Sequence, residues 1–128
     1  MDNFPKKYSV TKAFRFEAAH NLPGYEGVCA NLHGHSYRLE VTVEGEVQTE
    51  GPNLGMVVDF SDLKRAVDYC IIKELDHKNL NDVLPFRPTA ELMAAWILGK
   101  LLKYSGDYAK IKRVRLWETG NSYAEVEV

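Results

Sequence analysis

Residues 35–46 most restrict how this chain can fold, because apolar and polar side chains alternate there without interruption. One set is apolar and the other carries charges or hydroxyls: Tyr37, Leu39, Val41 and Val43 against Arg38, Glu40, Thr42 and Glu44. Successive side chains of a β-strand point to opposite faces. The segment therefore predicts a strand of an antiparallel sheet, with one buried face and one face that meets water or another subunit.

Other segments also have strand character. Between residues 8 and 19, Phe14 and Phe16 alternate with Arg15 and Glu17. The remaining expected strands are short and lie at residues 56–58, 111–117 and 123–128, the last two flanking a turn at Gly120 and Asn121. Gly- and Pro-rich stretches predict loops at residues 21–34 and 45–55.

Two segments have helical periodicity instead. Asp59 is a suitable N-cap for the first, and apolar residues follow at helical spacing to about residue 75, namely Phe60, Leu63, Val67, Ile71 and Leu75. Thr89 is expected to cap the second helix, which runs to about residue 104 with Leu92, Trp96 and Leu101 on its inner face. Irregular chain is expected at residues 76–87 and 105–110, and Cys70 is expected to be buried.

Strand pairs that flank two helices predict an α+β fold built on a mostly antiparallel sheet. The 128 residues suit a single domain spanning residues 1–128. Hydrophobic residues make up 45% and charged residues 27%, which is typical of a globular rather than a disordered chain.

Composition argues against several classes of function. The net charge of −2 gives no sign of the clustered basic surface that nucleic-acid binders use. No apolar run approaches the ~20 residues needed to span a membrane, and the polar first seven residues lack the apolar core of a signal peptide. We therefore expect a cytoplasmic protein without nucleic-acid or membrane partners, in which Cys29 and Cys70 stay reduced.

Three of the four histidines can be brought together by the expected strands. His33 and His35 are two positions apart, so on a strand their imidazoles project from the same face. His20 ends the first strand and lies beside them if the two strands form a hairpin. Three imidazoles with one open position are a common catalytic zinc arrangement, so we expect these histidines to bind zinc. His33 and His35 alone would be weak evidence, since exposed pairs are often incidental.

Cys29, four residues before His33, has two alternative roles. As a fourth ligand it would close the site, which is the arrangement expected of a zinc-stabilised module without catalysis. As a thiolate beside the metal it would act as a base or nucleophile. The residue pattern leaves both roles open.

Four other polar residues are weaker candidates. Asp76 can orient His77 only if the first helix has already ended, because adjacent residues of a helix do not face each other. Glu91 falls in the first turn of the second helix, where the helix dipole favours an acid in any case. Glu118, at a strand end, is either a surface residue or a ligand anchor.

Six motifs, in order along nearly the whole chain, resemble the 6-pyruvoyltetrahydropterin synthase family. They are F-E-A-A-H at 16–20, C-x-x-x-H-G-H at 29–35, V-D-F-S-D-L-K at 58–64, L-D-H-K-N-L-N at 75–81, P-T-A-E at 88–91 and E-T at 118–119. The three-residue gap between Cys29 and His33 is similar to that of the carboxy-forming branch, whereas animal-type pyruvoyl-forming members have a longer gap. Another branch has glutamate in place of the cysteine, and Cys29 argues against it.

The resemblance implies a T-fold, an antiparallel sheet with two helices on one face. Its subunits join into an oligomeric barrel, usually a hexamer of two trimers with active sites at subunit interfaces. It also implies roles for individual residues: zinc at His20, His33 and His35, proton abstraction by Cys29, proton relay or donation by His77 with Asp76 and by Glu118, and pterin anchoring by Glu91 beside Thr89. Glu118 could share or hold the anchoring role.

The implied substrate is 7,8-dihydroneopterin triphosphate. In the carboxy-forming branch a zinc-dependent lyase converts it to 6-carboxy-5,6,7,8-tetrahydropterin, acetaldehyde and triphosphate, in 7-deazaguanine (queuosine) biosynthesis. The alternatives are a pyruvoyl-forming lyase acting on the same substrate and a non-catalytic zinc-binding module. A generic zinc hydrolase has less support, because the chain has no H-E-x-x-H motif.

Overall fold

The two long alternating segments pair with each other and form the centre of the sheet. In the computed structural model, which describes residues 2–105 and 110–128, β1 (Tyr8–His20) runs antiparallel to β2 (His33–Gly45). The pairing is unbroken from Tyr8 opposite Gly45 to His20 opposite His33. The expected hairpin of the two strands is therefore confirmed, and both strands reach the histidines.

Three shorter strands complete the sheet in the order β3-β1-β2-β4-β5. β4 (Ile111–Thr119) and β5 (Ser122–Glu127) form the expected closing hairpin. The two-residue β3 (Lys78–Asn79) is parallel to β1, and every other pair is antiparallel.

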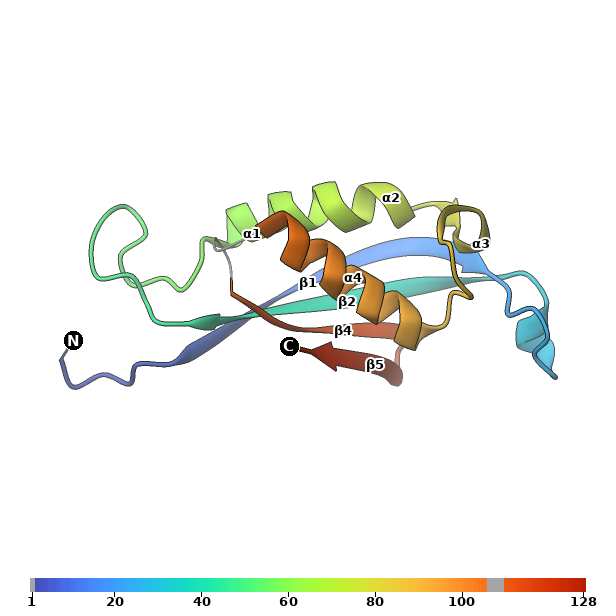
Figure 1. Ribbon diagram of the computed structural model, residues 1–128, viewed down its shortest axis with the longest axis horizontal. Helices are drawn as coiled ribbons and strands as arrows, with labels where there is room; N and C mark the ends of the chain where they lie inside the picture. Colours follow the sequence, from blue (N-terminus) through green and yellow to red (C-terminus); the bar gives the residue numbers. More distant parts are fainter. Residues whose placement is uncertain (1, 106–109) are drawn as a thin grey trace.

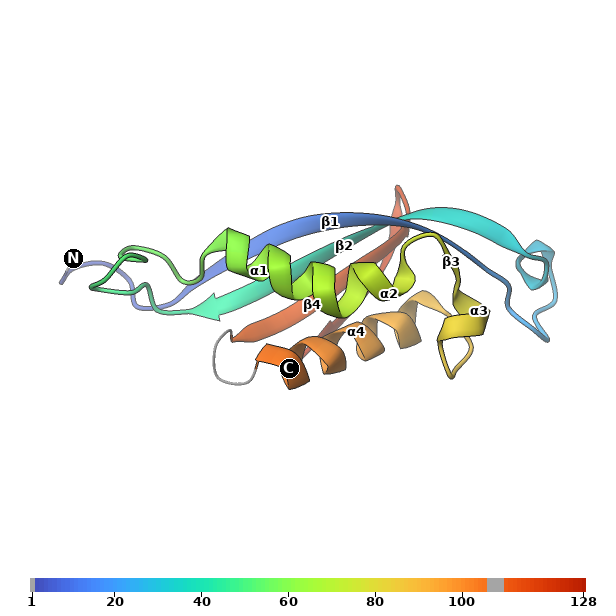
Figure 2. The same cartoon turned by 90° about the horizontal axis from the view of Figure 1, so that it is seen from above.

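The main helices lie on one face of the sheet, side by side (Figures 1 and 2). The first is continuous from α1 (Phe60–Val67) through a wide π-type turn at Asp68–Ile72 into α2 (Lys73–Leu75). The second is α4 (Ala90–Ser105), and the one-turn α3 (Leu80–Val83) lies between them in the chain. This is the α+β T-fold architecture that the sequence predicts.

The core lies between the sheet and this helical layer. Alternation turns one set of strand side chains inward, including Phe14, Phe16, Tyr37, Leu39, Val41, Val114 and Leu116. The helices contribute Leu63, Val67, Ile71, Leu75, Met93, Ile97 and Leu101, and Cys70 is buried as expected. Burying each large apolar side chain stabilises the folded state by about 1.5–3 kcal/mol. The apolar face of the hairpin is therefore the face that the helices cover.

Both expected helix caps are present. The Asp59 carboxylate accepts a hydrogen bond from the Ser61 N–H at 2.8 Å at the start of α1. The Thr89 hydroxyl accepts one from the Leu92 N–H at 3.2 Å at the start of α4. Each cap satisfies a backbone donor that has no partner within its helix.

Two expectations about the packing of apolar residues were wrong. Residues 56–58 form no strand: the Met56 carbonyl accepts a hydrogen bond from Gln48 within the loop, and Val58 packs into the core. Leu92 is not on the inner face of α4, since it is 48% exposed. The buried stripe of this helix begins one residue later, at Met93, and one position turns a helix by about 100°.

Residues 76–87 and 105–110 are the two segments that the sequence predicts to be irregular. Residues 76–87 contain β3 and α3, so they are more ordered than their sequence indicates. In the segment 105–110, Ser105 ends α4, and residues 106–109 lie outside the described part of the chain.

Leu101 and Leu92 offer a matched test of the packing of α4. Leu101 is 1% exposed, so Leu101→Ala leaves a cavity and should lower the free energy of unfolding by about 3 kcal/mol. Leu92→Ala should lower the free energy of unfolding by less than about 0.5 kcal/mol, because this side chain is exposed. Urea unfolding followed by circular dichroism measures both, and equal losses would contradict the inner face described above.

Candidate metal centre and active site

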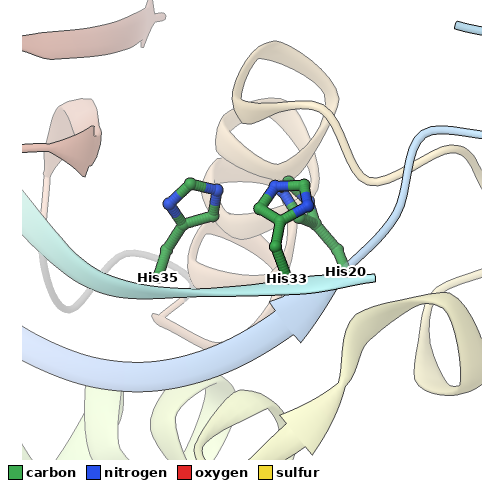
Figure 3. A group of neighbouring side chains, drawn as sticks. All are labelled: His20, His33 and His35. Carbon is green, nitrogen blue, oxygen red and sulfur yellow. The ribbon is translucent and has the colours of Figure 1, made fainter. Parts of the chain in front are cut away.

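The hairpin of β1 and β2 brings three imidazoles together at one end of the sheet (Figure 3). His20 and His33 are direct partners across the hairpin, and His35 is opposite Ala18 on the same face. The ring centroids are 4.6, 4.8 and 4.9 Å apart, and the rings cross at 66–87°. One nitrogen from each ring lies within 4.8 Å of the corresponding nitrogens of the other two.

Backbone carbonyls determine which nitrogens of His20 and His33 carry hydrogen. His20 Nδ1 is 2.8 Å from the Pro88 carbonyl oxygen, and His33 Nδ1 is 2.7 Å from that of Asn31. A carbonyl oxygen only accepts hydrogen bonds, so both Nδ1 atoms donate and both Nε2 atoms present lone pairs.

These two Nε2 lone pairs converge on one position. The Nε2 atoms of His20 and His33 are 3.0 Å apart. Two acceptors at this distance repel each other unless a cation or a proton lies between them. Nitrogens bound to one tetrahedral zinc ion at ~2.0–2.1 Å are about 3.3 Å apart, so this donor set fits a divalent metal.

His35 supplies a third available nitrogen. Its Nε2 is buried without a hydrogen-bond partner among the described residues, and it lies 3.6 Å from a Glu118 carboxylate oxygen. Burial lowers the pKa of His35; the charge of Glu118 acts in the opposite direction, and His20 and His33 lower the pKa further. The imidazole is therefore held in its neutral form, which is the form that binds metals.

Glu118 reaches this cluster from β4. The register of β4 and β5 shifts between Trp117 and Thr119, so Glu118 lies at an irregularity of the ladder. Such bulges commonly re-aim a side chain beside a functional site. The structure thus places the Glu118 carboxylate beside His35.

The first turn of α4 begins beside the cluster, because the Pro88 carbonyl that binds His20 directly precedes Thr89. The Thr89 hydroxyl serves as the helix cap, and Glu91 is exposed in the first turn. No hydrogen bond or ion pair joins either residue to the three histidines in the part of the chain that the structure describes.

Cys29 lies in a short 3-10 turn, Val28–Ala30, of the loop between β1 and β2. It is partly buried and free of any disulfide. Within the described ranges, the group of ligand atoms that could share one ion contains the three histidines and not Cys29. Its position gives no support to the role of a fourth ligand.

Asp76 and His77 lie just past the end of the first helix. Asp76 has an extended backbone, and His77 adopts the left-handed region with φ of 60°. Glu17 of β1 holds both: its N–H donates to the Asp76 carboxylate at 2.9 Å, and its carbonyl accepts from the His77 N–H at 2.6 Å. A left-handed backbone is costly for a histidine, and strain of this kind is often found at functional sites.

The helix end also allows the contact that a continuous helix would forbid, with His77 Nε2 3.6 Å from the Asp76 carboxylate. The imidazole is 78% exposed. It lines a groove of about 550 Å³ together with Glu17, Ser36 and His35. No hydrogen bond or ion pair among the described residues connects His77 to the other three histidines.

Sequence reasoning missed several supporting groups. The carbonyls of Asn31 and Pro88 and the backbone of Glu17 carry no signal in their residue type, because any residue offers the same atoms. Tyr37 is different: it is completely buried and contacts the rings of His20 and His35. Its place two residues after His35 puts it on the same strand face, so the alternation could have identified it.

Burial raises the pKa of Tyr37, and the negative charge of Glu118 raises it further. The phenol therefore keeps its proton throughout the physiological range.

Comparison with known proteins agrees with this geometry. The family model for 6-pyruvoyl tetrahydropterin synthase matches residues 9–128. The chain belongs to this family. Its relatives include 6-carboxy-5,6,7,8-tetrahydropterin synthases from Haemophilus influenzae, 36% identical over 94% of this chain and 99% of the relative, and from Synechocystis, 50% identical over 72% and 73%.

A further relative is the dihydroneopterin monophosphate aldolase of Pyrococcus furiosus, 42% identical over 88% of this chain and 90% of the relative. The 6-pyruvoyl tetrahydropterin synthase structure from Caenorhabditis elegans superposes with a TM-score of 0.83 at 26% identity, covering 95% and 96% of the two chains. Across the described residues, no helix is long and apolar enough to cross a membrane.

The fourth histidine provides a control for metal binding. His33→Ala removes one of the converging nitrogens and should reduce bound zinc from about one ion per chain to nearly none. His77→Ala should leave the zinc content unchanged, because His77 lies outside the cluster. Elemental analysis after dialysis measures both, and equal zinc contents in the two variants would refute the site.

Proposed function

We propose that this protein is a zinc-dependent 6-carboxy-5,6,7,8-tetrahydropterin synthase. It would convert 7,8-dihydroneopterin triphosphate and one water molecule to 6-carboxy-tetrahydropterin, acetaldehyde and triphosphate, in the pathway to 7-deazaguanine (queuosine). The observation that carries the proposal is the convergence of three imidazole nitrogens within 4.8 Å of one another, two of which, the Nε2 atoms of His20 and His33, are 3.0 Å apart. The relatives that bear this name over most of the chain support the same choice.

His20, His33 and His35 would hold the zinc ion, which when bound supplies a Lewis acid for the oxygens of the substrate side chain. The Cys29 thiolate would remove a proton from the adjacent carbon. Glu118, at the metal cluster, and His77, oriented by Asp76, are the groups available to relay and return protons.

Glu91 and Glu118 are the candidates for anchoring the pterin. The amino group and ring N–H of a pterin form a pair of donors like one edge of a guanidinium group, which suits a bidentate carboxylate. Thr89 would contribute by fixing the first turn of α4, which carries Glu91, beside His20.

The active site would be shared between chains of a homo-oligomer, in line with the hexamer that the family resemblance implies. Within the described part of one chain, Cys29 lies outside the group of possible metal ligands, no hydrogen bond or ion pair joins His77 to that group, and the His77 side chain is 78% exposed. An exposed imidazole on a backbone held by hydrogen bonds to Glu17 suits a group that would act in the site of a neighbouring chain.

A pyruvoyl-forming synthase acting on the same substrate is the alternative. The same three histidines and proton-transfer groups would serve it, and the matching family model carries the name of this activity. A non-catalytic zinc module has less support, since Cys29 is not placed to close the site.

The product distinguishes the two enzymes. The zinc-loaded protein should release acetaldehyde and 6-carboxy-tetrahydropterin in equal amounts from 7,8-dihydroneopterin triphosphate. A dicarbonyl tetrahydropterin without acetaldehyde would establish the alternative, and no turnover by a zinc-loaded protein would refute both.

The same assay tests Cys29. Cys29→Ala should keep its zinc and lose at least about a hundredfold in kcat, as expected for the loss of a general base. Cys70→Ala is the matched control, because Cys70 is buried in the core away from the cluster and should retain activity. A fully active Cys29→Ala variant would remove the cysteine from the mechanism.

Mixing inactive variants tests whether the site is shared. If Cys29 and His77 of one site come from different chains, Cys29→Ala and His77→Ala refolded together should recover up to about a quarter of wild-type activity, the share of interfaces with both groups intact. Each variant refolded alone is the control. Absence of recovery in mixed oligomers would contradict a shared site.

A further inference from the structure

Tyr37 of β2 lies beneath the candidate metal centre. It is completely buried, and the strand register places it directly opposite Phe16 of β1. The two rings stack with centroids 4.9 Å apart and an interplanar angle of 9°. Register and stacking together fix the Tyr37 ring with respect to the hairpin.

The Tyr37 ring contacts two of the three histidines. Its centroid is 6.2 Å from that of His20, at 87°, and 5.5 Å from that of His35, at 70°. These edge-to-face contacts limit the rotation of both imidazoles. One side chain therefore constrains two of the nitrogens that converge on the metal position.

The Tyr37 hydroxyl lies 3.4 Å from His20 Nδ1, which is 2.8 Å from the Pro88 carbonyl. Nδ1 carries one hydrogen, so the carbonyl is its main acceptor and the phenolic oxygen is a second, weaker one. Both acceptors favour the tautomer with hydrogen on Nδ1, which leaves Nε2 free to bind a metal. No other hydrogen bond of this hydroxyl is found within residues 2–105 and 110–128.

Core filling does not explain the hydroxyl. Stacking on Phe16 requires only the ring, and phenylalanine would supply it without taking a polar group out of water. A hydrogen-bond partner lowers the free-energy cost of burying a hydroxyl, and the partner here is the ring of a candidate metal ligand.

We propose that Tyr37 is a positioning residue of the metal centre: its hydroxyl holds His20 in the tautomer and orientation that direct Nε2 to the metal, while its ring fixes His35. This inference rests on the metal centre of the proposed function. It assigns Tyr37 no contact with substrate.

Tyr37→Phe tests the hydroxyl, because it keeps the stacked ring. We expect the zinc dissociation constant, measured by competition with a chromophoric chelator, to rise about tenfold, as is typical when a hydrogen-bond partner of a metal ligand is lost. The visible spectrum of the cobalt(II)-substituted protein should also change, because it reports the geometry of the ligands. Tyr69→Phe, at a helix tyrosine that is 61% exposed, is the matched control and should change neither.

Leu101→Ala separates positioning from general destabilisation, since Leu101 is a core residue that is no part of the histidine cluster. It should lower the melting temperature and leave zinc affinity unchanged. Unchanged zinc affinity and cobalt spectrum in Tyr37→Phe, or an equal loss of affinity in Leu101→Ala, would overturn the inference while the metal centre stands. If the wild-type protein binds neither zinc nor cobalt, the metal centre itself is refuted and the inference falls with it.

Discussion

The single register in which β1 pairs with β2 is the constraint on which both the core and the site depend. Side chains alternate along each strand, so a slip of one residue would move every inward side chain to the other face. The observed register places Phe16 opposite Tyr37 and His20 opposite His33. The register that buries the apolar pairs therefore also brings the three histidines together.

The inward face of the hairpin changes from apolar to polar along its length. Where the helices cover it, the inward residues are apolar, and at the end near the start of α4 they become histidines. His20 is nevertheless only 1% exposed, so its polar atoms have to be satisfied within the protein. The Pro88 carbonyl satisfies one nitrogen and leaves the other facing its neighbours, an arrangement in which a bound cation would relieve the repulsion between lone pairs. Metal binding to this folded arrangement would therefore stabilise the fold.

Apart from Cys29, the groups proposed to transfer protons fall into two sets. Glu118 lies beside His35 of the histidine cluster, whereas the backbone of Glu17 holds Asp76 and His77, and the His77 imidazole is 78% exposed. Holding the second set in a strained but well-defined geometry would prepare it to meet a site on another chain. In the proposed shared site, a neighbouring chain would bring this second set to the histidine cluster.

Much of the fold and of the histidine cluster could be predicted from the amino-acid sequence alone. The period of two in β1 and β2, the helical spacing and the two caps depend on neighbours in the chain, and so the elements and the convergence of His20, His33 and His35 could be predicted. Leu92 and residues 56–58 were misjudged because their surroundings, not their neighbours in sequence, decide whether an apolar residue is buried or paired. The tautomers of His20 and His33 and the clamp on Asp76 and His77 depend on backbone atoms that are distant in the chain or common to all residues. Only the tertiary structure could determine them, because a carbonyl or an N–H acquires its role from where the fold places it.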